Sequence, residues 1–258
     1  MKKLDEIINL LAELRLKGMA GVIERELARA DKQASPPSEV LARLLAEEKG
    51  YRQERSFLYR VKKARLAWPW TLESFPFNLQ PSLDKAQIMG LAGLDFMSRA
   101  ENIVFIGDPG VGKTGLAIGL LRQAVISGYH GRFFKAQDLL DELYASLADR
   151  GTPRLLKSLS AQDLLVIDEL GYLTLNSQQV NAFFKLMDER YQKKSTIITT
   201  NLDYPQWYDL FGRKTLVDAL LDRLKHHCVT IRVKGTSLRA KTETGPTPDT
   251  PGNGVTSR

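Results

Sequence analysis

Apolar side chains recur at helical spacing through the first 66 residues of the chain, beginning with Leu4, Ile7 and Ile8. This periodicity predicts an all-helical segment, because residues three and four apart share one face of a helix. The first predicted helix ends at Gly18. The second extends from Met19 to Lys32, and the third extends from Ser38 to Leu66. Ser38 is expected to cap the third helix, and Gly50 is a candidate interruption within it.

The pattern changes after this helical segment. Residues 67–82 contain three prolines and several aromatic residues, which predict a linker that packs on a neighbouring domain. In residues 83–241, short β-rich runs alternate with helical segments, which is typical of an α/β domain whose parallel sheet has helices on both faces. The expected strands are Asn102–Ile106, Arg132–Phe134, Leu164–Ile167, Thr196–Thr199 and Val229–Val233. Residues 242–258 are rich in Thr, Pro and Gly and are expected to be disordered.

The composition is that of a globular protein, since 43% of the 258 residues are hydrophobic and 26% are charged. The 37 basic residues exceed the 30 acidic ones, and this net charge of +7 makes nucleic acid a plausible partner. Cys228 is the single cysteine, which excludes an internal disulfide and a cysteine-rich zinc site. No stretch approaches the roughly 20 apolar residues of a membrane span. We therefore expect a cytoplasmic protein without a membrane partner.

The strongest motif lies between the first predicted strand and a helical run. It fits G-x-x-x-x-G-K-[ST] and comprises Gly107, Asp108, Pro109, Gly110, Val111, Gly112, Lys113 and Thr114. Backbone N–H groups of such a loop face phosphate oxygens, Lys113 adds a positive charge, and Thr114 offers a hydroxyl group to Mg²⁺. The motif therefore predicts binding of ATP with Mg²⁺. Gly110-x-Gly112-x-x-Gly115 also matches a dinucleotide pattern, but no acidic residue for a ribose follows the next strand.

Two later strands are expected to bring polar groups to the same edge of the sheet. Asp168 and Glu169 follow the third predicted strand, where Asp168 could hold Mg²⁺ and Glu169 could activate the attacking water. Asn201 follows the fourth predicted strand and could contact the γ-phosphate or that water. Arg223 lies in a late helical segment, and its local sequence alone favours an ordinary surface arginine.

Four further stretches, together with the phosphate loop, are similar to one group of ATPases. They are Thr71–Phe75, Asp168–Leu173, Asp218–Leu224 and Gly235–Arg239. The chain resembles the IstB-type transposition helper ATPases of the AAA+ initiator clade, which are related to the DnaC helicase loader. It departs from the usual residues of that family at Gly115, where His is common, and at Leu238, where Tyr is common.

This resemblance implies a RecA-like parallel sheet flanked by helices, with a small all-helical N-terminal domain at residues 1–66. It also implies ATP-dependent assembly of several copies on duplex DNA, with a transposase of the same mobile element as a partner. Asn201 would be a first phosphate sensor and Arg239 a second one. Arg223 would be a finger that reaches the γ-phosphate of a neighbouring copy.

Basic residues gather in two segments that are candidate DNA contacts. Residues 49–66 carry seven basic residues and one acidic residue, and a single helix would place most of them opposite Phe57 and Val61, which would face a core. An ordinary solvated helix face is the alternative interpretation of this segment. The second group lies between the second and third predicted strands. The candidate contacts are Arg52, Arg55, Lys62, Lys63, Arg150, Arg154 and Lys157.

The leading interpretation is a DNA-dependent ATPase that assembles with ATP on duplex DNA and assists a transposase in insertion-sequence transposition. A helicase loader of the DnaC type in DNA replication is the alternative, which the motifs do not separate from it. A small-molecule kinase is disfavoured by Asp168, Glu169 and Asn201. A DNA-binding scaffold that uses ATP only as a structural ligand would bind ATP without hydrolysing it.

Overall fold

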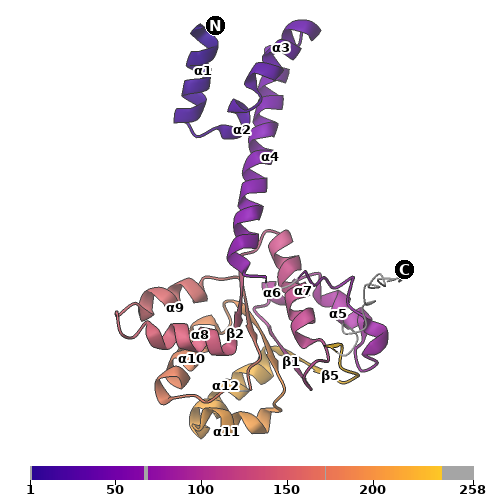
Figure 1. Ribbon diagram of the computed structural model, residues 1–258, viewed down its shortest axis with the longest axis vertical. Coiled ribbons are helices and arrows are strands. Elements are labelled where there is room, and N and C mark those ends of the chain that lie inside the picture. Colours follow the sequence, from indigo (N-terminus) through magenta and orange to yellow (C-terminus); the bar gives the residue numbers. More distant parts are fainter. Residues whose placement is uncertain (1, 67–68, 172, 240–258) are drawn as a thin grey trace, which may run out of the picture.

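The computed structural model describes residues 2–66, 69–171 and 173–239. It consists of an elongated helical arm at the N-terminus and an α/β domain at the base of this arm (Figure 1). The predicted disordered tail at residues 242–258 lies outside the described residues.

Four helices form the arm, and their boundaries differ from those that the sequence predicts. They are α1 (Lys2–Glu13), α2 (Lys17–Ala20), α3 (Ile23–Gln33) and α4 (Pro37–Ala64). The predicted helix end at Gly18 is wrong, because Gly18 lies inside α2. Ser38 is not the cap of α4, since Pro36 holds that position and Pro37 is already a favourable first helical residue. Gly50 does not interrupt α4, which runs unbroken through 28 residues.

Gly18 lies inside α2 because α2 packs closely against α4. A Cβ atom at Gly18 would lie 2.7 Å from Tyr51 Cβ and 2.8 Å from Glu48 Cα, so a larger residue would force the helices apart. The Glu48 carboxylate accepts hydrogen bonds from the backbone N–H groups of Gly18 at 2.7 Å and Met19 at 3.2 Å. Arg52 contacts the same carboxylate at 2.6 Å and, with these N–H groups, holds the pKa of Glu48 below its usual value.

A small apolar core joins the helices of the arm. Its buried members are Leu11, Met19, Ile23, Val40 and Leu44. Other apolar side chains of the arm are at least half exposed, namely Leu10 of α1, Leu14 in the turn after α1, and Leu41 and Leu45 of α4. The arm therefore presents an apolar surface that no part of the described chain covers.

The lower end of α4 is attached to the α/β domain through two arginines and one aromatic ring. The guanidinium groups of Arg65 and Arg132 lie 5.1 and 4.5 Å from the centre of the Phe134 ring. Glu142 pairs with both guanidinium groups, at 3.7 and 3.8 Å. Arg60 also donates to the carbonyl group of Val125 at 3.3 Å. Cation–π contacts contribute roughly 0.5–2 kcal/mol each, so this joint fixes the arm at its base.

Five parallel strands form one sheet in the order β2-β3-β4-β1-β5. They are β1 (Asn102–Gly107), β2 (Gly131–Lys135), β3 (Leu164–Asp168), β4 (Ser195–Thr200) and β5 (Cys228–Val233). Each strand is one or two residues longer than predicted, and all five predicted strands are present. Because the strands are parallel, the residues that follow β1, β3 and β4 meet at one edge of the sheet.

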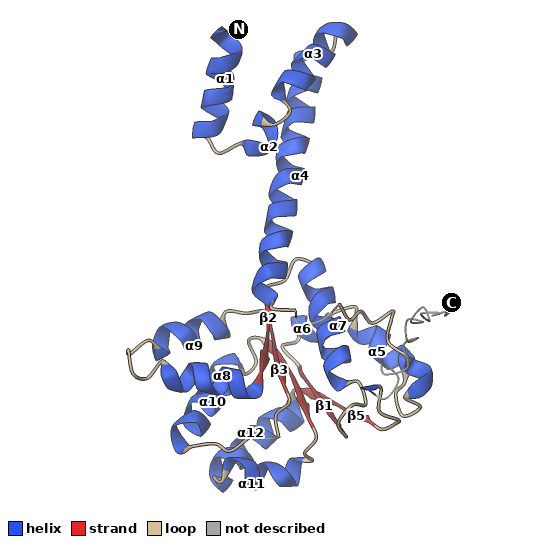
Figure 2. Ribbon diagram, viewed as in Figure 1, coloured by secondary structure: helices blue, strands red, loops and turns tan. Residues whose placement is uncertain are grey.

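Helices cover both faces of the sheet, as the sequence predicts (Figure 2). One layer consists of α5 (Lys85–Leu91), α6 (Asp95–Ser98) and α7 (Lys113–Ile126). The other consists of α8 (Ala136–Ala145), α9 (Thr152–Ser160), α10 (Ser177–Arg190), α11 (Trp207–Phe211) and α12 (Lys214–His226). Short 3₁₀ turns lie at Phe77–Leu79 and Tyr204–Gln206. Along β1, Ile103 and Phe105 enter one core and Val104 and Ile106 the other, because side chains alternate across a strand.

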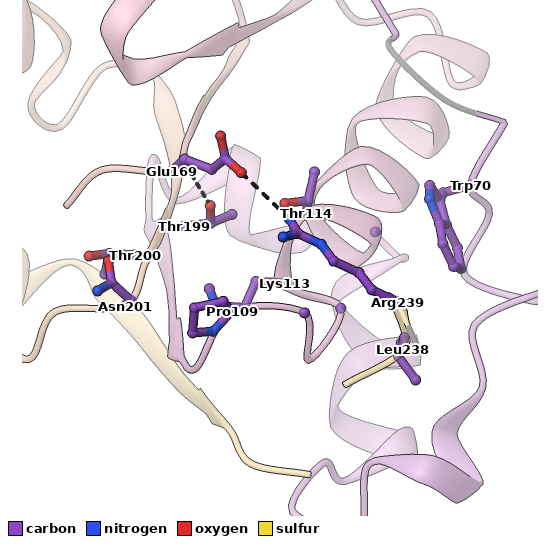
Figure 3. A pocket seen from close by; sticks show the side chains of 13 residues that line it. Trp70, Pro109, Lys113, Thr114, Glu169, Thr199, Thr200, Asn201, Leu238 and Arg239 are labelled. Carbon is purple, nitrogen blue, oxygen red and sulfur yellow. Dashed lines mark hydrogen bonds and ion pairs between the residues drawn. The ribbon is translucent and has the colours of Figure 1, made fainter. Parts of the chain in front are cut away.

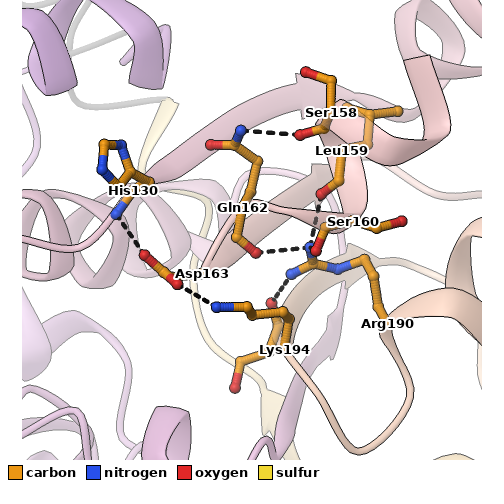
Figure 4. A network of polar contacts seen from close by, with 9 residues as sticks. His130, Ser158, Leu159, Ser160, Gln162, Asp163, Arg190 and Lys194 are labelled. Carbon is orange, nitrogen blue, oxygen red and sulfur yellow. Dashed lines mark hydrogen bonds and ion pairs between the residues drawn. The ribbon is translucent and has the colours of Figure 1, made fainter. Parts of the chain in front are cut away.

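A buried arginine fixes the opposite, amino edge of the sheet (Figure 4). Arg190 of α10 is 1% exposed, and its guanidinium group donates to the carbonyl oxygens of Leu159 and Gln162, each at 2.8 Å. A further N–H group donates to the carbonyl oxygen of Ser195. Burial lowers the pKa of Arg190 to about 9. These carbonyl groups come from the last turn of α9, the turn that follows it and the start of β4, so Arg190 joins these segments.

Candidate functional site

The predicted phosphate loop lies between β1 and α7, in the strand–loop–helix context that the motif requires. Gly110 and Gly112 have φ angles of +83° and +98°, in the left-handed region that favours glycine. The ammonium group of Lys113 lies within the loop and donates to the carbonyl oxygens of Gly107 at 2.6 Å and Asp108 at 2.8 Å. Burial lowers the pKa of Lys113, and the acidic residues nearby oppose this shift.

These two glycines also let other segments pack directly on the loop. A Cβ atom at Gly110 would collide with the side chain of Ser237. One at Gly112 would lie 2.7 Å from the Phe75 ring and 2.9 Å from Leu238 Cδ1. The backbone N–H group of Leu238 donates to the carbonyl oxygen of Gly110 at 2.8 Å. The loop is therefore held from both sides, by the predicted linker and by the segment after β5.

Thr114 and Asp168 are in direct contact, although 54 residues separate them in the sequence. The Thr114 hydroxyl group donates to Asp168 Oδ1 at 2.9 Å, and the Thr199 hydroxyl group of β4 donates to the same oxygen at 2.5 Å. Burial raises the pKa of Asp168, while hydrogen bonds from Thr199 and Thr114 oppose the rise. A hydroxyl group beside a carboxylate offers the oxygen ligands that Mg²⁺ prefers, so these residues fit the predicted metal site.

Glu169 lies between two cations at the carboxyl end of β3. Its carboxylate is 3.7 Å from Lys135 Nζ and 3.8 Å from Arg239 Nη2. Its backbone has a left-handed φ of +60°, and its N–H group donates to Thr199 Oγ1 at 2.9 Å. The side chain is 45% exposed, and exposed ion pairs of this length are weak. The backbone of Glu169 is therefore held by a hydrogen bond, whereas its carboxylate is held only by weak ion pairs.

A cavity of about 550 Å³ extends along the phosphate loop (Figure 3). Its wall includes eight of the residues that the sequence predicts for the site, namely Pro109, Gly110, Gly112, Lys113, Thr114, Glu169, Asn201 and Arg239. Segments that are far apart in the sequence thus converge on one space, as predicted. The wall also includes Trp70, Thr199, Thr200 and Leu238, which the sequence analysis did not assign to the site. The only signal for Trp70 was its aromatic character, which indicated packing of the linker.

Arg223 lies on α12, away from this cavity. Its guanidinium group pairs with Asp188 at 2.9 Å and lies 5.5 Å from the centre of the Tyr191 ring. Within the described part of the chain, the cavity wall does not include Arg223. In this arrangement, a contact between Arg223 and a bound phosphate would need a second copy of the chain.

The candidate DNA contacts occupy two separate surfaces, and the structure does not bring them together. On α4 the exposed residues are Arg52, Arg55, Lys62 and Lys63, whereas Arg150, Arg154 and Lys157 are exposed on α9 and just before it. The prediction that Phe57 faces a core is wrong, because this side chain is 36% exposed. Val61, one turn closer to the domain, packs against its core as predicted.

Comparison with known proteins assigns the chain to a family. The family profile for the IstB-like ATP binding protein matches residues 9–245. The chain belongs to this family. An IstB-like relative, the ATP-binding protein of insertion sequence IS21 from Pseudomonas aeruginosa, is 38% identical over 238 residues, which cover 92% of this chain and 90% of the relative.

Other matches agree with this assignment. The ATP-binding protein of insertion sequence IS5376 from Geobacillus stearothermophilus is 36% identical over 204 residues, which cover 79% of this chain and 81% of that protein. Among solved structures, the DnaC helicase loader is 28% identical with a TM-score of 0.56, over 66% of this chain and 99% of the DnaC chain. The predicted IstB-type resemblance and the AAA+ fold class are confirmed. Among the described helices, none combines the length and the apolar character needed to cross a bilayer.

Proposed function

We propose that this IstB-like protein is a Mg²⁺-dependent ATPase that assembles with ATP on duplex DNA and assists the transposase of an insertion sequence. The observation that carries the ATPase proposal is the convergence of Lys113, Thr114, Asp168 and Glu169 beside one cavity. The volume of this cavity, about 550 Å³, is in the range of small-molecule sites. The insertion-sequence names of the relatives support the link to transposition.

The position of each residue suggests its part in hydrolysis. Lys113 would exchange its two loop carbonyl contacts for oxygens of the β- and γ-phosphates. Thr114 and Asp168 would hold Mg²⁺, which supplies positive charge to the phosphate oxygens when it is bound. Glu169 would accept the proton of the attacking water through its carboxylate, and Asn201 would orient that water or contact the γ-phosphate.

Arg223 is proposed to complete the site of a neighbouring copy. Its side chain is 35% exposed and pairs with Asp188 outside the cavity of its own copy. An arginine supplied in trans stabilises the charge of the transferred phosphate, so turnover would depend on assembly. The exposed apolar residues of α1 and α4 offer surface for this self-association.

We propose a division of the chain into four parts. Residues 1–66 would bind DNA or a protein partner, residues 67–82 would act as the linker, and residues 83–241 would form the ATPase domain. Residues 242–258 would form a tail. Exposed basic residues on α4 and α9 would neutralise DNA phosphates, which gives binding that weakens steeply with salt.

A helicase loader is the second candidate, and the match to DnaC favours it. This match extends over 99% of the DnaC chain. A loader would prefer single-stranded DNA and would bind a replicative helicase in place of a transposase.

Glu169→Gln, followed by ATP turnover and analytical ultracentrifugation with duplex or single-stranded DNA, tests the proposal. We expect turnover to fall at least ~100-fold while an ATP-dependent assembly on duplex DNA persists, because only the proton acceptor is removed. Glu101→Gln, which changes a carboxylate remote from the cavity wall, is the matched control and should keep wild-type turnover. Undiminished turnover in Glu169→Gln would show that the catalytic assignment is wrong. Assembly on single-stranded DNA alone would favour the loader.

A further inference from the structure

Trp70 and the polar end of β4 lie at opposite ends of the cavity. Figure 3 shows the indole ring of Trp70 on one side, Thr200 and Asn201 on the other, and Lys113 between them. A nucleotide whose γ-phosphate lies toward Glu169 and Asn201 would extend its base in the direction of the indole. The cavity thus has a phosphate end and an aromatic end.

The indole ring of Trp70 lies flat against the first turn of α7. A Cβ atom at Gly115 would lie 3.4, 3.5 and 3.7 Å from Cδ2, Cε3 and Cε2 of the indole. Three such similar distances to adjacent ring atoms place the α7 backbone over the face of the ring. Gly115 therefore lets the indole approach the helix that carries Lys113 and Thr114.

The backbone around Trp70 is fixed as well. Arg122 Nε of α7 donates to the carbonyl oxygen of Trp70 at 3.1 Å. Two residues further on, Leu72 is buried, and a Cβ atom at Gly119 would lie 2.7 Å from its Cδ2. These two contacts with α7, at Trp70 itself and at Leu72, hold the indole at the cavity wall, and such pre-organisation reduces the entropy lost when a ligand binds.

We propose that Trp70 is the nucleobase-stacking residue of this site, an inference that rests on the proposed binding of ATP. A nucleobase has a flat π-surface, and the indole is the aromatic side chain in the described cavity wall. Its neighbours Gly115 and Leu238 carry no polar side-chain atoms. The chemistry at this end therefore favours recognition of the base by stacking, while the phosphate loop binds the other end of the nucleotide.

Calorimetric titration with two probes, Mg–ATP and Mg–tripolyphosphate, separates the base from the phosphates. For Trp70→Ala we expect the Kd of ATP to rise about 5- to 100-fold, which corresponds to roughly 1–3 kcal/mol of stacking at 1.4 kcal/mol per tenfold change. The Kd of tripolyphosphate should stay at the wild-type value. Trp70→Phe, which keeps an aromatic ring, should restore most of the affinity for ATP.

Three results would overturn the inference. An equal loss of affinity for both probes would show that Trp70 only supports the loop. An unchanged Kd for ATP would show that the base lies elsewhere, and tighter binding of ATP would show that the indole obstructs the base. A wild-type protein that binds neither probe would instead contradict the proposed function. Thermal unfolding of each variant would establish that it is folded before it is titrated.

Discussion

The hydroxyl group of Thr199 donates a hydrogen bond of 2.5 Å to the carboxylate of Asp168. The same hydroxyl oxygen accepts a hydrogen bond from the backbone N–H group of Glu169 at 2.9 Å. This contact is possible because β4 lies beside β3 in the sheet, with Ile167 opposite Ile198. One buried side chain of β4 thus positions both the proposed Mg²⁺ ligand and the proposed proton acceptor.

Thr199→Val should lower ATP turnover by roughly 10- to 100-fold, with a smaller effect on ATP binding. The substitution keeps the shape of the side chain but leaves the N–H group of Glu169 without its acceptor, a loss that costs about 1–3 kcal/mol when the group is buried. Turnover at saturating ATP and unfolding in urea measure the two effects. Thr199→Ser, which retains the hydroxyl group, should restore turnover, and wild-type activity in Thr199→Val would argue against this positioning role.

Asp168→Asn should stabilise the nucleotide-free protein while it abolishes hydrolysis. Burial raises the pKa of Asp168, so the folded protein binds this proton more tightly than the unfolded chain does. The contribution of Asp168 to the free energy of unfolding therefore falls as the pH rises from 3.8, the ordinary pKa of this group, through the raised pKa in the folded protein. Asparagine carries no charge, so the Tm of the variant at pH 7 should exceed that of the wild type, by about 2–4 °C for each 1 kcal/mol of destabilisation that is removed.

Thermal scans without Mg²⁺ between pH 4 and pH 8 would measure this effect as the difference between wild type and Asp168→Asn. The difference in Tm should grow with pH, because only in the wild type does ionisation of the buried carboxylate oppose folding. A lower Tm for the variant at every pH would contradict the prediction.

Arg239→Ala and Lys135→Ala should differ in their effect on ATP binding, although both residues flank Glu169. Arg239 lines the cavity, whereas Lys135 does not belong to the wall formed by the described residues. Loss of Arg239 should therefore raise the Kd of ATP by about tenfold, and loss of Lys135 should leave it within about twofold, since a charge-assisted contact contributes roughly 1.5–3 kcal/mol. Equilibrium titration would distinguish the two variants, and equal effects would remove Arg239 from the proposed phosphate contacts.

Two glycine substitutions in the arm should have opposite effects on its stability. Gly50→Ala should stabilise α4 by about 0.5–1 kcal/mol, because a Cβ atom there meets no neighbour within 4 Å and alanine favours the helix. Gly18→Ala should destabilise the arm, since its Cβ atom would press against Tyr51 and the α4 backbone. Helix melting followed by circular dichroism would show both shifts, and a Gly18→Ala variant as stable as wild type would mean that α2 can move away from α4.

The sheet and the phosphate loop could be predicted because each depends on local signals. A buried parallel strand is an apolar run, and the loop requires glycines and lysine at fixed spacing. The position of Thr199 in the site was not predicted, because threonine is an ordinary strand residue. Only the pairing of β3 with β4 places its hydroxyl group beside Asp168. The position of Trp70 in the cavity wall was not predicted for a similar reason, since its contact with α7 depends on how the linker folds back.

The predictions for the arm helices at Gly18 and Gly50 were wrong for the same physical reason, which is that the outcome depends on tertiary contacts. Glycine is often a helix terminator, so Gly18 and Gly50 looked alike in the sequence. Their environments differ, because Gly18 lies against α4 while Gly50 has open space around it. Tertiary packing, which a single sequence does not display, decides what each glycine does.

The 28 residues of α4 make the arm a lever. At 1.5 Å per residue the helix is about 42 Å long, so a rotation of about 10° at its base would carry its far end through roughly 7 Å. The base of the arm contacts the α/β domain through Arg65, Phe134 and Glu142, and the chain continues from there into the segment that carries Trp70. A rotation of that size would therefore displace the tip of the arm by more than the pitch of a helical turn, about 5.4 Å.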